Sequence, residues 1–212
     1  KVNGPKEING AWYYFDQYGE QVKDRFASDG RYYDENGKQV DFGTNRYFEL
    51  NGEWYYAGND GAILKGPQTI DGVKVYFDQG GVQVKGYFAR DYSDNNKRYY
   101  DKDSGALATN QYIIAYNPYR HRNERYYVND QGIRLTGPQT IDGKQVYFDT
   151  YEGSHTGVPD VTGKGADCAR QRLSAAGLNC VVEGNTGGTV QAQSEEPGSS
   201  VQRGTIVTIT CG

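Results

Sequence analysis

Short aromatic runs recur along the first 150 residues, and each is followed by a turn that contains glycine. Aromatic residues favour pleated strands, and Asn-Gly or Asp-Gly supplies the positive φ angles of a tight hairpin turn. Each run therefore predicts one β-hairpin. The seven runs are Trp12–Asp16, Arg31–Asp34, Trp54–Tyr56, Val75–Asp78, Arg98–Asp101, Arg125–Tyr127 and Val146–Asp149.

A longer repeat contains these hairpins, because the segment Gly66–Gly72 returns unchanged as Gly137–Gly143. An isolated two-stranded hairpin is marginally stable in water. Hairpins this short must stack, each burying an aromatic face against the next unit. We therefore predict a mainly β fold for residues 1–153, in the form of an elongated β-hairpin solenoid.

The pattern changes after a short polar joint at residues 154–157. Ala169, Leu173 and Ala176 fall at helical spacing on one face, and Gly177 is a natural helix stop. Three strand candidates follow, at residues 178–182, 190–194 and 205–210. We predict a small α+β domain over residues 158–212, with one helix on a three-stranded sheet.

Composition supports this division into two modules. Every aromatic residue lies at or before Tyr151, whereas the three cysteines all follow it. A module of this size buries little surface, so one disulfide would stabilise it, and an exported setting would permit the bond. The pairs Cys180–Cys211 and Cys168–Cys180 are both compatible with the predicted elements, and the sequence does not choose between them.

Several function classes are excluded by the rest of the composition. The net charge is −4 with no basic stripe, so we expect no nucleic-acid partner. No apolar run is long enough to span a membrane, and no signal peptide opens the chain, whose lack of methionine is typical of an excised segment. The two histidines lack partners at metal-ligand spacing, so we expect neither a metal nor a cofactor.

No catalytic residues are predicted either. A glycosidase needs two carboxylates set in a cleft. The repeated aspartates instead occupy equivalent turn positions, where capping of the turn explains them better. They are Asp16, Asp34, Asp78, Asp101 and Asp149.

Most aromatic residues in such a solenoid belong to the stacking core, so we look for binding residues among the polar positions. An exposed aromatic ring can cover the apolar face of a pyranose, while nearby polar groups satisfy its hydroxyls. A Gln-x-Lys pair, with both side chains on one strand face, is intact in only two copies. These pairs are Gln21 with Lys23 and Gln83 with Lys85, which follow the strand aromatics Tyr14 and Tyr76.

The segments Thr69–Gly86, Arg98–Gly105 and Gly137–Phe148 closely resemble the glucan-binding repeats of glucansucrases and streptococcal glucan-binding proteins. The resemblance implies a non-catalytic module that binds α-glucan chains of the dextran type. Carried over to this chain, it implies a best pocket and a second, weaker pocket in which Glu7 replaces a threonine. The best pocket contains Thr69, Tyr76, Gln83 and Lys85, closed by Tyr87 or Phe88, and the second contains Tyr14, Gln21 and Lys23. A third, starting at Thr140 and Tyr147, is interrupted by His155, and we expect it not to bind.

Residues 158–212 resemble a PASTA domain, through Val158-Pro-Asp-Val161, Gly177-Leu178 and Pro197-Gly198 among others. This resemblance implies contact with peptidoglycan or a role as a spacer. The main alternative for the repeats is a choline-binding module, which needs aromatic cages around a quaternary ammonium. The chain has no Gly-Trp pair to build such cages, and a neighbouring lysine would repel the cation.

Together these patterns predict an accessory region of a secreted, glucansucrase-type glycosyltransferase or of a bacterial surface protein. It would hold that protein on α-glucan or on the cell wall, with avidity from two weak sites. A purely structural spacer is the alternative from another class.

Overall fold

The computed structural model describes residues 2–91 and 93–212. The chain divides into two compact units. The first unit extends to Asn95 and includes Tyr100–Leu107, and the second comprises Asn96–Tyr99 and Ala108–Gly212. The division falls within the fifth of the seven repeat copies.

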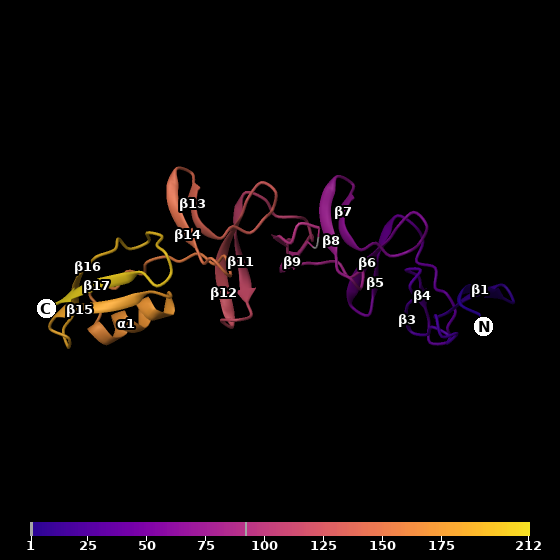
Figure 1. Ribbon diagram of the computed structural model, residues 1–212, viewed down its shortest axis with the longest axis horizontal. Helices are drawn as coiled ribbons and strands as arrows, with labels where there is room; N and C mark the ends of the chain where they lie inside the picture. Colours follow the sequence, from indigo (N-terminus) through magenta and orange to yellow (C-terminus); the bar gives the residue numbers. More distant parts are fainter. Residues whose placement is uncertain (1, 92) are drawn as a thin grey trace. The chain divides into compact units, whose positions relative to one another are not determined.

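The repeat copies consist of two-stranded antiparallel hairpins, labelled by strand in Figure 1. In the first unit, β1 (Gly4–Ile8) pairs with β2 (Ala11–Phe15), β3 (Arg25–Phe26) with β4 (Tyr32–Tyr33), β5 (Arg46–Leu50) with β6 (Glu53–Ala57) and β7 (Gly66–Ile70) with β8 (Val73–Phe77), and β9 is Phe88–Arg90. In the second unit, β10 is Lys97–Tyr99, β11 (Gln111–Asn117) pairs with β12 (Arg122–Val128) and β13 (Gly137–Ile141) pairs with β14 (Lys144–Phe148). The hairpin turns have the predicted chemistry: both Asn9 and Gly10, for example, have positive φ angles.

A second turn after each hairpin is capped by a side chain. The Asp16 carboxylate accepts the backbone N–H groups of Tyr18 and Glu20 at 2.8 and 2.9 Å. Asp34 and Asp78 accept equivalent pairs, as does the amide oxygen of Asn129. The repeated acidic residues therefore cap turns, as the sequence predicts.

Two backbone hydrogen bonds position the residues that follow each turn. The first stays within the copy, as when Val84 N–H donates to the Tyr76 carbonyl at 2.8 Å. The second reaches the preceding hairpin, and we call it the inter-copy bond. Within residues 2–91 and 93–212, six inter-copy bonds run from the N–H groups of Gln39, Ile63, Gln83, Leu107, Arg134 and His155 to the carbonyls of Trp12, Gly30, Trp54, Lys74, Lys97 and Arg125, respectively, at 2.6 to 3.0 Å.

Aromatic rings fill the space between the stacked copies. Phe42 and Phe48 stack with centroids 4.1 Å apart, and Phe26 lies 4.9 Å from Tyr55. Tyr33 and Phe77 are completely buried. The aromatic excess of the sequence is therefore largely a packing feature, in a mainly β repeat fold of the predicted class.

The last 55 residues form the predicted helix-and-sheet domain (Figure 1). Helix α1 (Ala166–Ala175) packs against a sheet in which β15 (Asn179–Gly184) lies parallel to the central β17 (Ile206–Cys211), and β16 (Val190–Gln193) lies antiparallel to it. Ala169 and Leu173 are fully buried against Val207 and Ile209.

The predicted disulfide is not supported, because all three thiols are free. Cys180 pairs in register with Val207 in the parallel strand, and Cys211 lies four residues further along that strand. This offset of about 13 Å far exceeds the separation that a disulfide spans. Cys168 is exposed on α1, outside its buried face, whereas Cys180 packs against the core.

Residues 154–157, expected to form a linker, are hydrogen bonded to both the last hairpin and the helix-and-sheet domain. Thr156 N–H donates to the Tyr147 carbonyl, and Val201 N–H donates to the Thr156 carbonyl at 3.2 Å. Ser200 Oγ accepts the N–H of Tyr147 at 2.9 Å. The segment around Ser200 thus occupies the end of the repeat array, which would otherwise present unpaired backbone groups. Among the described residues, no helix has the length and apolar character needed to cross a membrane.

We expect Gly81→Ala to destabilise the fold more than Gly52→Ala does. Both glycines have φ angles above +80°, which costs an L-residue about 1–2 kcal/mol. A Cβ at Gly52 meets nothing within 4 Å, whereas one at Gly81 clashes with the Ile63 side chain, adding about 1–3 kcal/mol of overpacking. Urea denaturation measures the difference. Equal losses in the two variants, or no recovery on adding Ile63→Ala to Gly81→Ala, would contradict this packing.

Candidate functional site

The inter-copy bond between the third and fourth hairpins brings an exposed tryptophan beside the Gln83–Lys85 segment. Gln83 N–H donates to the Trp54 carbonyl at 2.7 Å, which fixes the segment that carries Lys85 next to β6. The indole of Trp54 remains 42% exposed. Lys85 Nζ lies 5.4 Å from the ring centroid, within the range of a cation–π interaction.

A second exposed aromatic residue follows on the same segment. Tyr87 is 49% exposed, and partial burial raises the pKa of its hydroxyl, with further contributions from the carboxylates of Asp78 and Glu53. The Tyr87 hydroxyl therefore lies in the electrostatic field of the Asp78 and Glu53 carboxylates. We call Trp54, Lys85 and Tyr87, with Glu53 and Asp78, the aromatic surface.

Two of the predicted pocket residues instead lie in the interior. Tyr76 is only 4% exposed and packs with Val84, Ala89 and Tyr100, and its hydroxyl donates to the Arg90 carbonyl at 3.2 Å. Its ring faces are thus engaged in the core.

The other buried residue is Gln83, which is 7% exposed and lies beneath Gly105 of the next turn. A side chain at Gly105 would clash with its amide. The remaining predicted residues lie closer to solvent: Thr69 is exposed on β7, and Phe88 is half-buried on β9.

The glutamine position has the same role in several copies. Gln21 lies beneath Gly37, Ile63 beneath Gly81, Gln83 beneath Gly105 and Arg134 beneath Gly153. Because an isoleucine fills the same place as the two glutamines, this position supports the next turn. The lysine two residues later lies closer to solvent: Lys23 is exposed and Lys85 is half-buried.

The first copy has a different environment. Tyr14 hydrogen bonds through its hydroxyl to Ser28 Oγ at 2.5 Å, and Gln21 donates to the Asn36 carbonyl at 3.4 Å. Lys23 and Glu7 are exposed. The role of these residues in binding stays a prediction.

Trp54 is the residue that sequence reasoning missed. Its signal is positional: the two tryptophans, Trp12 and Trp54, both provide the carbonyl that accepts an inter-copy bond. Only at Trp54 is the incoming segment followed by a lysine and a tyrosine. At Trp12 the corresponding residues are Asp41 and Gly43.

The third copy of the pocket motif ends at a half-buried histidine. The His155 ring packs edge-on against Tyr112 and Phe148, with ring centroids 6.2 and 5.9 Å away. The backbone N–H of His155 donates to the Arg125 carbonyl. Burial lowers the pKa of His155, and the Arg125 guanidinium adds to this effect. The Thr140 hydroxyl accepts a hydrogen bond from Gln145, and Tyr147 is half-buried.

We expect His155 to make the stability of the protein depend on pH. The unfolded chain binds a proton near pH 6.5, whereas the folded protein binds it only at lower pH, so stability falls as the pH drops through and below that value. Thermal unfolding at pH 7.5 and 5.5 measures the effect. His155→Gln, which installs the residue found in the intact copies, should reduce the dependence, and exposed His121→Gln should not. Equal dependence in all three proteins would contradict the lowered pKa.

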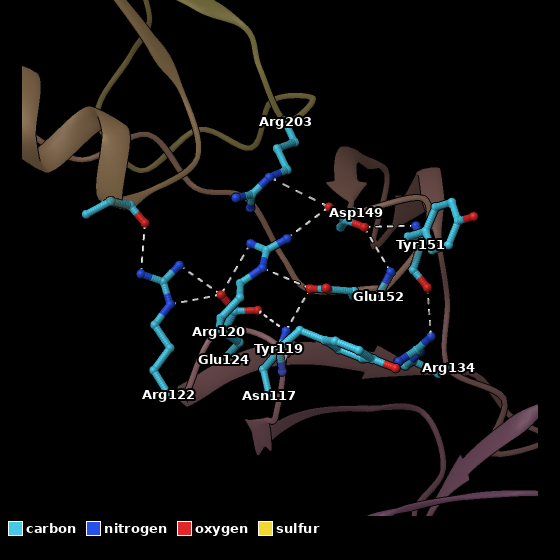
Figure 2. A network of polar contacts seen from close by, with 11 residues as sticks. Asn117, Tyr119, Arg120, Arg122, Glu124, Arg134, Asp149, Tyr151, Glu152 and Arg203 are labelled. Atoms are coloured by element: carbon cyan, nitrogen blue, oxygen red, sulfur yellow. Dashed lines mark hydrogen bonds and ion pairs between the residues drawn. The ribbon is translucent and has the colours of Figure 1, made fainter.

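A polar network in the second unit joins the repeats to the helix-and-sheet domain, as Figure 2 shows. Arg120 lies 3.4, 3.1 and 2.9 Å from the carboxylates of Glu124, Asp149 and Glu152. Arg122 donates to the Ala175 carbonyl at the end of α1 at 2.9 Å. In the described part of the chain, no group of three or more His, Cys, Asp or Glu residues is positioned to hold a metal ion.

Known family descriptions match both the hairpin array and the domain that follows it. The family description "Choline-binding repeat" matches residues 2–47 and 64–112, and "Putative cell wall binding repeat" matches residues 45–63. The "PASTA domain" description matches residues 156–212. The chain thus consists of choline-binding-type repeats followed by a PASTA domain, and these segments are not a catalytic domain.

Similarity to individual curated proteins covers up to 71% of the chain. Glucosyltransferase-S of Streptococcus mutans is 43% identical over 159 residues, which cover 71% of this chain and 10% of the relative. The chain therefore spans about a tenth of the length of the curated relatives it matches. The predicted resemblance to glucansucrases is confirmed.

Two solved structures are similar to part of the chain. Choline binding protein F of Streptococcus pneumoniae is 24% identical with a TM-score of 0.44, covering 77% of this chain and 55% of its own. Alternansucrase in complex with isomaltononaose is 28% identical with a TM-score of 0.30, covering 74% of this chain and 15% of its own.

Proposed function

We propose that the repeats bind α-glucan chains of the dextran type and hold a secreted glucosyltransferase or surface protein on polymer or on the bacterial cell wall. The 43% identity to Glucosyltransferase-S supports this assignment. The observation that carries it is the exposed indole of Trp54 with the Lys85 ammonium 5.4 Å from its centroid.

The aromatic surface matches the chemistry of a glucose unit. The apolar C–H face of the sugar covers the Trp54 or Tyr87 ring, because both rings combine a wide apolar face with exposure to water. The Lys85 ammonium donates hydrogen bonds to sugar hydroxyls, and the carboxylates of Asp78 and Glu53 accept them. Thr69 and Phe88, which are not buried, are further proposed ligand contacts, while Tyr76 and Gln83 contribute through packing.

A second site around Tyr14, Gln21 and Lys23 adds avidity. Each site is weak by itself, and one polymer chain that reaches both raises the apparent affinity through effective concentration. The PASTA domain provides contact with peptidoglycan or serves as a spacer. The whole protein acts outside the cell, at the bacterial surface.

Choline is the second candidate ligand, because the matched repeats carry its name. A quaternary ammonium binds over the face of an aromatic ring. The Lys85 ammonium lies 5.4 Å from the centroid of the Trp54 ring, and its positive charge would repel a quaternary ammonium there. The aromatic surface therefore favours a neutral polyhydroxyl ligand over choline.

Trp54→Ala should weaken dextran binding about tenfold, which corresponds to about 1.4 kcal/mol. Lys85→Ala should weaken it in the same direction. Trp12→Ala is the matched control, because Trp12 is similarly exposed and lacks the lysine and tyrosine beside Trp54. Affinity electrophoresis in native gels containing dextran measures the retardation of each protein.

Unretarded migration of the unmodified chain would overturn the glucan assignment and favour a structural spacer. Retardation that is equal in Trp54→Ala and unmodified protein would remove the aromatic surface from the proposal. Retention on a choline matrix, with elution by free choline, would favour the second candidate.

A further inference from the structure

A pocket of about 300 Å³ lies between the last hairpin and the PASTA domain, within the second unit. Its lining from the hairpin side includes Phe148, Asp149 and Thr150, and its lining from the PASTA side includes Gly177, Gln202 and Arg203. We call it the junction pocket. Its volume suits a ligand of roughly the size of one sugar ring.

One wall carries a fixed negative charge. One carboxylate oxygen of Asp149 accepts the N–H groups of Tyr151 and Glu152, and the other lies 3.1 Å from the Arg120 guanidinium (Figure 2). Burial opposes ionisation, but these N–H groups and Arg120 outweigh it and lower the pKa of Asp149. The carboxylate thus stays ionised, and the turn holds it in place.

The PASTA side of the pocket carries a guanidinium whose charge is incompletely compensated. Arg203 Nε lies 3.8 Å from the Asp149 carboxylate. Arg120 lies closer to the same carboxylate, at 3.1 Å, so that Asp149 balances only part of the Arg203 charge. The other two guanidinium nitrogens lie against Gly177, where a Cβ would be only 2.6 and 3.0 Å from them. Because Gly177 has no side chain, it leaves room for the two terminal nitrogens of the Arg203 guanidinium.

Two uncharged polar side chains complete the opening. Thr150 and Gln202 are exposed at the pocket, and within the described residues neither side chain has a recorded hydrogen bond. Their hydroxyl and amide groups can donate to and accept from a ligand. The site thus combines one guanidinium, one carboxylate and two neutral polar side chains.

We propose that the junction pocket binds the carboxylate of a small polar ligand, supplied either by a sugar acid or by a peptide C-terminus. A guanidinium binds a carboxylate through two parallel hydrogen bonds, which Arg203 is free to direct into the pocket. Asp149 accepts a hydroxyl or amide hydrogen from the same ligand. The fixed negative charge of Asp149 disfavours a phosphate with two charges, and the two arginines disfavour a cation.

The proposal is tested by titrating the isotopically labelled 212-residue chain with D-glucuronate, N-acetylglycine and methyl glucoside, and following the amide signals of Gly177 and Gly204 by NMR. Saturable shifts are expected with one or both of the carboxylates and not with the neutral glucoside. The first two probes distinguish a sugar acid from a peptide end as the source of the carboxylate.

Arg203→Gln should weaken carboxylate binding about 10- to 100-fold, as expected for loss of hydrogen bonds to a charged group. Thr150→Trp, which fills the opening and leaves Arg203 in place, should also abolish binding. Arg172→Gln, on the exposed side of α1, is the matched control and should bind normally. If the NMR spectrum shows that Arg203→Gln is unfolded, the affinity of the Thr150→Trp protein for the carboxylates decides the test.

Three results would overturn the proposal. They are the absence of saturable shifts with both carboxylates, equal binding of methyl glucoside, and unchanged affinity in a folded Arg203→Gln or Thr150→Trp protein. None of these outcomes depends on glucan binding by the repeats, because Trp54 lies in the other unit.

Discussion

The inter-copy backbone hydrogen bond is the interaction on which the repeat fold depends. A hairpin with strands of two to seven residues cannot bury enough surface to be stable alone. Each described copy after the first therefore donates one N–H, from the residue just beyond its turn, to a carbonyl of the preceding hairpin. This bond sets the register between copies, and the register decides which side chains of successive copies meet. Trp54 and Lys85 are brought together in this way.

The same register separates packing roles from binding roles within one short motif. The first residue of the Gln-x-Lys pair lies beneath a turn glycine of the next copy, a place that Ile63 fills equally well. The lysine, two residues later, reaches the surface beside Trp54. A repeat can therefore retain its fold while the residue at this position changes, since the packing position accepts several side chains. This explains how copies with the same backbone differ in their candidate chemistry.

The end of the repeat array presents a different problem, because the last copy has no following copy to pair with. Backbone and side-chain bonds from the segment around Ser200 fill this place, and Arg122 extends the contact to the end of α1. The PASTA domain thus closes the array in the manner of a capping repeat. A contact between two modules with different surfaces leaves space between them, and the junction pocket lies there, with charges from both sides.

Local features of this protein were predictable from the sequence alone. The Asn-Gly and Asp-Gly turns, the capping aspartates, the helix that ends before Gly177 and the change of module near residue 155 all depend on residues close together in the chain. The exposure of each aromatic residue was not predictable in this way, since Tyr76 and Trp54 occur in similar runs and differ in what the neighbouring copy places over them. The disulfide failed for the same reason, because the register of β15 against β17 separates Cys180 from Cys211. Only the tertiary structure decided these features, because hydrogen bonds and side-chain packing between residues distant in sequence determine them.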